Sequence, residues 1–253
     1  MNDHAERSAN DHSWKYEVLS KLHEKTWFGF DLDDTLHEFR KASNAAVLST
    51  ILKVSTEHRI AIDDLKASYK IILTQKTAQA FTDGKSSDDY RKERFAAVLR
   101  DFSVEATPGF LDELAAIYKA KLKLSLELKA GAVSLLTYLK SIGKKIVVIT
   151  EGPQDAQEWT LEILGLSEFV DYLATTNYFG VSKMSGIFEK VLVELGIEAT
   201  ELAYVGDSLE RDILPTRARG IYSIHFSEQE GAELSTDGLR INSLNELELI
   251  LRR

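Results

Sequence analysis

The sequence predicts an α/β protein with a parallel sheet and an inserted helical domain, on three observations. After residue 126, buried strand-like runs alternate with amphipathic helices, a pattern typical of right-handed crossovers and a parallel sheet. Residues 41–126 show only helical periodicity. A single strand-like run at 27–30 precedes this helical block, so the block interrupts the α/β domain. A chain of 253 residues is long enough for one large domain or two unequal ones.

The domain boundaries follow from the order of these elements. Residues 1–25 form a polar N-terminal extension, in which Trp14, Val18 and Leu22 recur at helical spacing. We expect the α/β core domain to comprise residues 26–41 and 126–253, and the helical domain to comprise residues 42–125.

Each predicted element has its own evidence in the chain. Val47, Leu48 and Ile51 mark the first helix of the helical domain by their spacing. Turn residues at 82–86 and 107–109 separate the helices that follow, predicted at 62–79, 87–101 and 108–121. Apolar runs after residue 126 predict strands at 146–149, 172–174, 202–205 and 221–225. A short strand at 239–241 and a helix at 244–251 complete the chain.

Composition excludes several functional classes. The 31 basic and 40 acidic residues give a net charge of −9, which opposes binding to a nucleic acid polymer or an anionic membrane. The absence of cysteine excludes disulfides, thiolate metal sites and a cysteine nucleophile. The polar N-terminus lacks an apolar segment of the kind that targets proteins for secretion, so we expect a cytoplasmic protein. The oligomeric state stays open between monomer and homodimer.

Polar residues follow four of the predicted strands, at the sheet edge where ligands bind in open parallel sheets. The first strand is followed by two acids, the second by a hydroxyl, an acid and a glycine, the third by a lysine and the fourth by two more acids: Asp31, Asp33, Thr150, Glu151, Gly152, Lys183, Asp207 and Asp212. Any one of them alone is more typical of a turn, a helix cap or a solvated side chain. Their ordered combination predicts one site.

Four segments together resemble the motifs of the haloacid dehalogenase superfamily of phosphohydrolases. They are FDLDDTL at 30–36, VITEG at 148–152, GVSK at 180–183, and VGDS at 205–208 with Asp212 after it. The resemblance covers nearly the whole chain after residue 25. It implies a flavodoxin-like core with a helical cap inserted after the first strand. Glu151 is a departure, because the family commonly has asparagine there, and it places another acid beside a phosphate pocket.

Asp31 and Asp33 suit the two roles that phosphoester hydrolysis requires. Asp31 would attack phosphorus and form an aspartyl phosphate, and Asp33 would protonate the leaving oxygen and then deprotonate the hydrolytic water. The resemblance implies the same division. It also disfavours the 2-haloacid dehalogenases and the phosphonate-cleaving branch, because both generally lack the acid found here at Asp33.

A carboxylate that approaches a phosphate dianion meets repulsion of about 4 kcal/mol per pair of unit charges at about 4 Å and an effective dielectric near 20. We therefore expect Mg²⁺, held by Asp31, Asp207 and the backbone carbonyl of Asp33. Asp212 would act through water or by pairing with Lys183. The Lys183 ammonium, the Thr150 hydroxyl and the backbone amides of Glu151 and Gly152 would bind phosphate oxygens.

The sequence thus predicts a Mg²⁺-dependent phosphomonoesterase that acts on a small phosphorylated metabolite. Two alternatives stay open: a phosphomutase or phosphotransferase with the same acids, and a non-catalytic binding module that retains the fold. Within the helical domain, Lys85 follows Gly84 where similar capped phosphatases present a specificity loop, so Lys85 and Arg94 are candidate substrate contacts. A solvated helix face is an equally good interpretation of both. His37 we interpret as an ordinary surface or loop residue.

Overall fold

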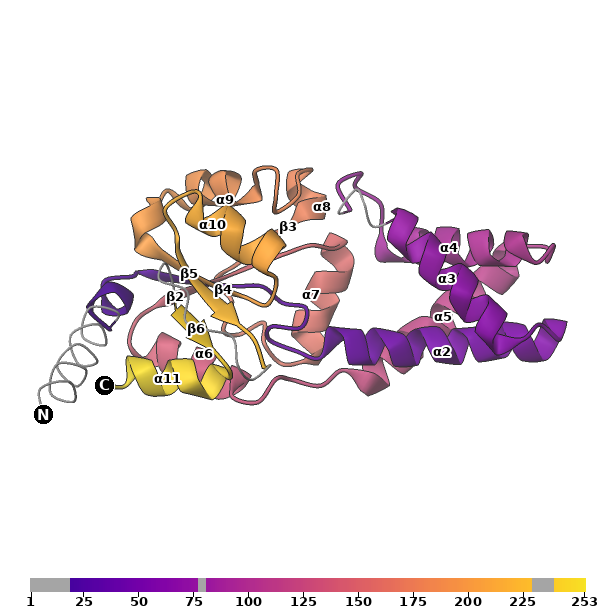
Figure 1. Cartoon of the computed structure of the whole chain (residues 1–253), viewed down its shortest axis with the longest axis horizontal. Helices are drawn as coiled ribbons and strands as arrows, with labels where there is room; N and C mark the ends of the chain where they lie inside the picture. Colours follow the sequence, from indigo (N-terminus) through magenta and orange to yellow (C-terminus); the bar gives the residue numbers. More distant parts are fainter. Residues whose placement is uncertain (1–18, 77–80, 229–238) are drawn as a thin grey trace, which may run out of the picture.

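A six-stranded parallel sheet lies at one end of the molecule and a bundle of helices at the other (Figure 1). The computed structural model describes residues 19–76, 81–228 and 239–253. The strand order is β3-β2-β1-β4-β5-β6, and each neighbouring pair is parallel. The strands are β1 (Trp27–Phe30), β2 (Lys145–Thr150), β3 (Tyr172–Thr175), β4 (Leu202–Gly206), β5 (Tyr222–Phe226) and β6 (Leu239–Ile241). The predicted parallel α/β fold is confirmed.

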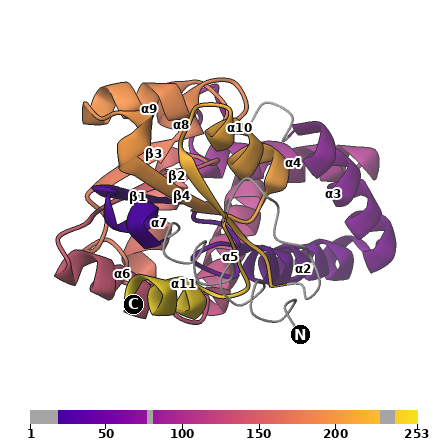
Figure 2. The same cartoon turned by 60° about the vertical axis from the view of Figure 1, so that its left-hand side comes forward.

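Both faces of the sheet are covered, which explains why its central strands are apolar throughout. Helices α6 (Ala132–Ser141) and α11 (Leu244–Leu251) pack on one face, and α9 (Ile187–Leu195) packs on the other (Figure 2). Gly29 in β1 allows the close packing of the α9 face, because a Cβ there would lie 2.7 Å from Cδ2 of Tyr204. Two apolar clusters, one on each face, therefore fix the sheet.

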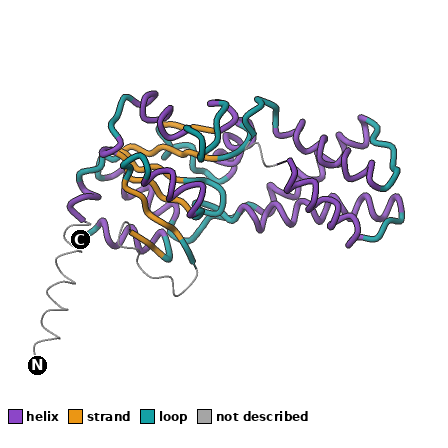
Figure 3. The backbone as a smooth tube through the Cα atoms, turned by 45° about the horizontal axis from the view of Figure 1, so that its top comes forward, coloured by secondary structure: helices purple, strands orange, loops and turns teal. Residues whose placement is uncertain are grey.

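Four helices between β1 and α6 form the helical insertion. They are α2 (Phe39–His58), α3 (Ile62–Lys76), α4 (Ser87–Asp101) and α5 (Pro108–Ser125). The described residues of the insertion form helices and loops alone, whereas the described strands all lie in the other part of the molecule (Figure 3). It has its own apolar cluster, which includes the fully buried Leu65, Leu99 and Leu114. The insertion thus has a core separate from those of the sheet.

Local sequence fixes several helix ends in the insertion. The Ser86 hydroxyl accepts a hydrogen bond from the Asp89 amide and the Asp89 carboxylate accepts one from the Ser86 amide, so α4 begins with a capping box. The Thr107 hydroxyl caps α5, whose first residue is Pro108. These caps explain why both helices begin where the sequence predicts.

The structure differs from the predicted elements mainly in the short ones. Helix α5 continues to Ser125, four residues beyond the predicted end. Four short helical turns were not predicted, because three to five residues are too few to show a periodic apolar pattern. They are α8 (Thr176–Phe179), η2 (Ala199–Glu201), η3 (Leu209–Ile213) and α10 (Leu214–Arg217). Helix α7 (Gln154–Ile163) follows β2. Trp14, Val18 and residues 77–79 of a predicted helix lie outside the described residues. Within the described ranges, no helix is both long and apolar enough to cross a bilayer.

Candidate active site

The structure brings together polar residues that lie more than 150 positions apart in the chain. Asp31 directly follows β1, Lys183 lies between α8 and α9, and Asp212 lies in the π-helical turn η3 after β4. Nζ of Lys183 is 2.5 Å from Oδ1 of Asp31 and 2.7 Å from Oδ1 of Asp212. All three side chains are buried. They form an ion-paired cluster at the carboxyl ends of the strands.

Asp207 adds a third carboxylate to this cluster. One oxygen from each of Asp31, Asp207 and Asp212 lies within 4.8 Å of the others. Oδ2 of Asp207 is 3.2 Å from Nη2 of Arg40, but Oδ1 is buried and has no hydrogen-bond partner among the described residues. Oxygen ligands of this kind suit a hard divalent cation such as Mg²⁺. The donor set and the orphaned oxygen both fit such an ion.

The ionisable groups of the cluster have shifted pKa values. Burial raises the pKa of Asp31 well above its usual value, although the Lys183 charge opposes the shift. Burial also raises the pKa of Asp207, and the nearby Asp212 carboxylate adds to the effect. Burial by itself would lower the pKa of Lys183, but the two carboxylates beside it raise it, so this side chain stays an ammonium. The site therefore favours additional positive charge.

Two neighbours besides Lys183 hold the Asp212 carboxylate in place. The Ser208 amide donates to Oδ2 at 3.0 Å, and the Tyr204 hydroxyl lies 3.1 Å from Oδ1. Position 206 must be glycine, because a Cβ there would lie 2.5 Å from Cβ and Cγ of Asp212. Asp212 is thus a fixed anchor for Lys183. Tyr204 was not among the predicted site residues, because in the sequence it is one of several apolar residues of a buried strand.

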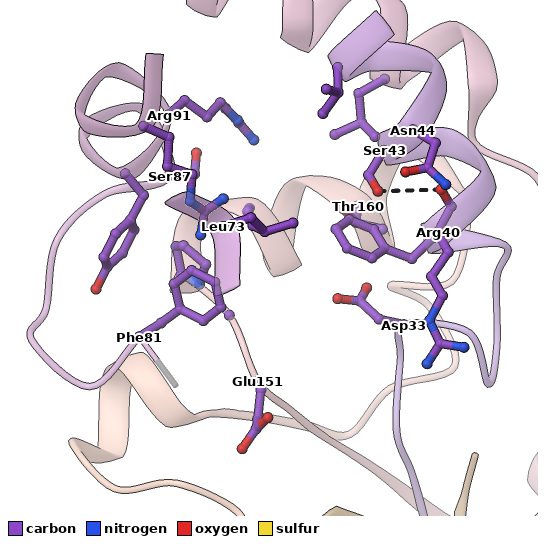
Figure 4. A pocket seen from close by; sticks show the side chains of 18 of the residues that line it. Asp33, Arg40, Ser43, Asn44, Leu73, Phe81, Ser87, Arg91, Glu151 and Thr160 are labelled. Carbon is purple, nitrogen blue, oxygen red and sulfur yellow. Dashed lines mark hydrogen bonds between the residues drawn. The ribbon is translucent and has the colours of Figure 1, made fainter. Parts of the chain in front are cut away.

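Asp33 has a buried partner, His37, for which the sequence predicted an ordinary surface or loop role. Nε2 of His37 lies 2.9 Å from Oδ1 of Asp33, and the His37 side chain is fully buried. His37 does lie in the loop between β1 and α2, but the prediction of an ordinary surface role is wrong, because the side chain is buried. The His37 backbone forms isolated β-bridges with Asp33 and with Leu128, so this loop is held against the segment that follows α5. The Asp33 carboxylate points into the cavity (Figure 4).

The segment after β2 presents different groups from those expected. The Thr150 hydroxyl is buried and has no hydrogen-bond partner among the described residues, so it is free to bind a ligand. The Glu151 carboxylate accepts from the Lys183 amide at 3.3 Å and lies 3.2 Å from Nη1 of Arg211. Its charge is therefore compensated. The Gly152 amide donates to Oγ1 of Thr176 at 3.3 Å, so it already has an acceptor.

Arg40 and Arg211 are further site residues that the sequence did not reveal. Arg40 contacts both Asp34 and Asp207, and Arg211 contacts Glu151. Both arginines line the cavity. No motif identifies them, because a surface arginine on a helix and one that turns into a cleft look the same in sequence.

A cavity of about 890 Å³ lies between the sheet and the helical insertion. Its core end contains the acids and its other walls come from α2, α3, α4 and α5, as Figure 4 shows in part. Of the two predicted substrate contacts in the insertion, Arg94 lines the cavity and Lys85 does not. Nζ of Lys85 instead lies 3.2 Å from Asp83 and 2.8 Å from Glu93. These carboxylates hold its ammonium in an exposed ion pair away from the cavity.

Comparisons with known proteins cover both parts of the chain. The family model described as haloacid dehalogenase-like hydrolase matches residues 26–218. The chain is 29% identical over 226 residues to the glyceraldehyde 3-phosphate phosphatase of Methanocaldococcus jannaschii, covering 86% of this chain and 93% of that protein. It is 29% identical over 229 residues to the pyrimidine 5'-nucleotidase YjjG of Escherichia coli, covering 89% and 97%. A magnesium-bound structure of the HAD-hydrolase YfnB of Bacillus subtilis has a TM-score of 0.68 and 25% identity, covering 90% of this chain and 99% of that one.

Proposed function

Because the chain belongs to the haloacid dehalogenase-like hydrolases, we propose that it is a Mg²⁺-dependent phosphatase that hydrolyses small phosphorylated metabolites through an aspartyl-phosphate intermediate. The observation that carries this proposal is the contact of buried Asp31 with Lys183, with Asp33 directed into the same cavity two residues later. The relatives named as a sugar-phosphate phosphatase and a nucleotidase support the substrate class.

Asp31 and Asp33 divide the reaction between them. A carboxylate oxygen of Asp31 attacks phosphorus, the bond to the leaving oxygen breaks, and protonated Asp33 gives that oxygen its proton. Asp33 then takes a proton from water, which attacks the aspartyl phosphate, releases inorganic phosphate and restores the Asp31 carboxylate. His37 acts as a positioning residue, because its ring holds the Asp33 carboxyl at 2.9 Å.

The phosphoryl group needs positive and neutral donors around it. The Lys183 ammonium offsets charge next to Asp31, and the unpartnered Thr150 hydroxyl can donate to a phosphate oxygen. Asp31, Asp207 and the backbone oxygen of Asp33 would hold Mg²⁺, with Asp212 acting through water or through Lys183. A bound Mg²⁺ supplies counter-charge for the attacking carboxylate and for the phosphate.

The helical insertion serves as a cap over this chemistry. The Asp155 carboxylate on α7 accepts from the Ser87 amide at 3.0 Å and from the Ser87 hydroxyl at 2.7 Å. The Asn177 amide donates to the backbone oxygens of Phe81 and Lys85, both at 3.2 Å. These contacts join cap and core directly. A closed cap limits bulk water around Asp31, so that the water that Asp33 deprotonates is one held inside the cavity.

A hydrolysis panel tests the proposal. The purified protein is assayed with p-nitrophenyl phosphate and with a set of sugar phosphates and nucleoside monophosphates, before and after treatment with EDTA. We expect phosphate release that EDTA abolishes and Mg²⁺ restores. Asp31→Asn should abolish both release and covalent labelling by [³²P]phosphoester, whereas the exposed control Asp63→Asn should retain both.

Three outcomes would contradict all or part of the proposal. If no phosphoester is hydrolysed in the presence of Mg²⁺, the protein is not a phosphatase and the non-catalytic alternative gains support. If an Asp31→Asn preparation free of wild-type enzyme keeps most of its turnover, Asp31 is not the nucleophile. Full activity in metal-free protein would remove the metal ligands from the proposal while leaving hydrolysis itself intact.

A further inference from the structure

The wall that the helical insertion gives to the cavity is basic. No acidic residue of α2 to α5 lines the cavity in the part of the chain that is described, whereas five basic residues do: Arg40 at the start of α2, Lys66 and Lys70 on α3, and Arg91 and Arg94 on α4. Every acid in the lining follows β1 or β2. Figure 4 shows Arg91 across the cavity from the core end. The chain as a whole has a net charge of −9, so this wall has the opposite sign of charge from the protein overall.

Charge balance separates the two ends of the cavity. At the core end every basic lining residue has a carboxylate within ion-pair distance: Lys183 with Asp31 and Asp212, Arg211 with Glu151, and Arg40 with Asp34 and Asp207. On the wall formed by α3 and α4, Arg91 pairs with the half-exposed Asp88 and Lys66 pairs with the exposed Asp63, and neither carboxylate is part of the lining. The field inside the cavity near α4 is therefore positive.

Arg94 is the least satisfied of these residues. Its guanidinium carbon lies 5.4 Å from the centre of the Phe81 ring. Nε and Nη2 are buried and have no hydrogen-bond acceptor among the described residues. Burial raises the pKa of Tyr69, and both the charge of the neighbouring Arg94 and a side-chain hydrogen bond with it oppose that rise. Donors left without an acceptor in this way cost about 1–3 kcal/mol each, a cost that a bound anion would remove.

Aromatic rings hold this pair of guanidinium groups in place before any ligand arrives. The Arg91 guanidinium carbon lies 5.0 Å from the centre of the Tyr118 ring, and Arg94 stacks near Phe81. The Tyr90 hydroxyl beside them is also buried without a partner among the described residues. A planar guanidinium can bind two oxygens of a phosphate or carboxylate at once. The arrangement is that of an anion site with its donors already positioned.

We propose that Arg94, assisted by Arg91, is a second anion site of this enzyme, so that its preferred substrates are phosphomonoesters that carry another phosphate or a carboxylate. This inference rests on the proposed function, and it assigns the substrate class. The scissile phosphate binds at the acidic core end, and the second anion binds at the α4 wall. A cavity of about 890 Å³ is near the upper end of small-molecule pockets, so it has room for a body between the two anions.

Matched pairs of substrates test the inference in the wild-type enzyme. Fructose 1,6-bisphosphate is compared with fructose 1-phosphate and fructose 6-phosphate, and 3-phosphoglycerate is compared with glycerol 3-phosphate. The first set asks whether the second anion is a phosphate, and the second asks whether it is a carboxylate. We expect kcat/KM to be at least tenfold higher for the doubly anionic ester in one set. No preference in either set would overturn the inference.

Variants on α4 connect the preference to Arg94. Arg94→Gln should lower kcat/KM for the preferred doubly anionic ester at least tenfold more than kcat/KM for p-nitrophenyl phosphate, which has no second anion. Arg94→Lys should restore part of the preference, because it keeps the charge. Lys92→Gln is the matched control, since Lys92 lies on the same helix, pairs with Asp112 and does not line the cavity. It should leave the ratio unchanged.

The outcomes separate this inference from the proposed function. If Arg94→Gln lowers both activities equally, or neither, Arg94 does not read the substrate and the inference is wrong. Hydrolysis of p-nitrophenyl phosphate by the same variant shows that it folds. If wild type hydrolyses no phosphoester at all, the proposed function fails first. If it hydrolyses p-nitrophenyl phosphate with Mg²⁺ but shows no preference for a second anion, only the second anion site fails.

Discussion

The two ends of the cavity are built on opposite electrostatic principles. At the core end, buried acids outnumber bases and each base is paired with a carboxylate, as Lys183 is with Asp31 and Asp212. At the insertion end, bases stand beside aromatic rings, as Arg94 does beside Phe81. The core end can handle a phosphoryl group common to many substrates. The insertion end can distinguish among the molecules that carry it.

The two ends also differ in how they are held. Asp31 and Asp207 at the core end lie directly after parallel strands whose hydrogen-bonded register fixes them relative to one another. The insertion folds around its own apolar cluster. It contacts the core through polar groups, such as Ser87 with Asp155, and through Trp159 of α7, which packs against that cluster. Variation at one end should therefore leave the other largely intact, and this separation can be tested.

The largest effect should come from the core end. Asp33→Asn removes the proton donor and acceptor, so kcat with an alkyl phosphate should fall about 1,000-fold, equivalent to about 4 kcal/mol. With p-nitrophenyl phosphate, whose leaving group needs little protonation, labelled aspartyl phosphate should accumulate in rapid-quench experiments. An equal loss with both esters and no labelled protein would argue against the role of Asp33.

A deletion in the insertion core should destabilise that part alone. Leu114 and Leu135 are both fully buried, the first in the insertion and the second beneath the sheet. Leu114→Ala should cost about 3 kcal/mol of unfolding free energy, as Leu135→Ala should. Hydrogen exchange should accelerate across α2 to α5 in the first variant and across the sheet in the second. Faster exchange of both regions in both variants would show that the molecule unfolds as one unit.

Loss of the His37 contact should have a smaller effect on the core end. His37→Phe keeps the ring volume but removes the hydrogen bond to Asp33, which should lower kcat for an alkyl phosphate by about 10-fold to 100-fold, or about 2 kcal/mol. The loss should be smaller with p-nitrophenyl phosphate. His37→Gln, which restores a donor, should recover part of the rate. A purely structural role would lower both rates together without recovery.

The smallest effect should follow from loosening the joint between the two ends. Asp155→Ala removes the carboxylate that accepts from Ser87, so the insertion should open more often and KM should rise about threefold to tenfold, or about 1 kcal/mol. Asp89→Ala is the control, because Asp89 caps the same helix without contacting the core. It should lower thermal stability slightly and leave KM unchanged. Equal KM changes in both variants would attribute the effect to the helix end.

Much of this architecture is predictable from local pattern. The strand at Trp27–Phe30 and the helix at Ser87–Asp101 lie where the sequence places them, because apolar periodicity and a capping box are properties of neighbouring residues. The π-helical turn Leu209–Ile213 was not predicted, because five residues are too few to show a periodic apolar pattern. It is nevertheless the turn that delivers Asp212 to Lys183.

The candidate site divides along the same line. The sequence by itself determined which acids end the strands, because parallel strands bring their carboxyl ends to one edge and Asp31 and Asp207 follow two of them. Only the tertiary structure decided which other side chains join them. Lys85 and Arg94 are equally basic in sequence, yet Asp83 and Glu93 hold Lys85 in an exposed ion pair. Arg94 lines the cavity and lies beside the Phe81 ring. Such choices depend on contacts between elements, which no local pattern contains.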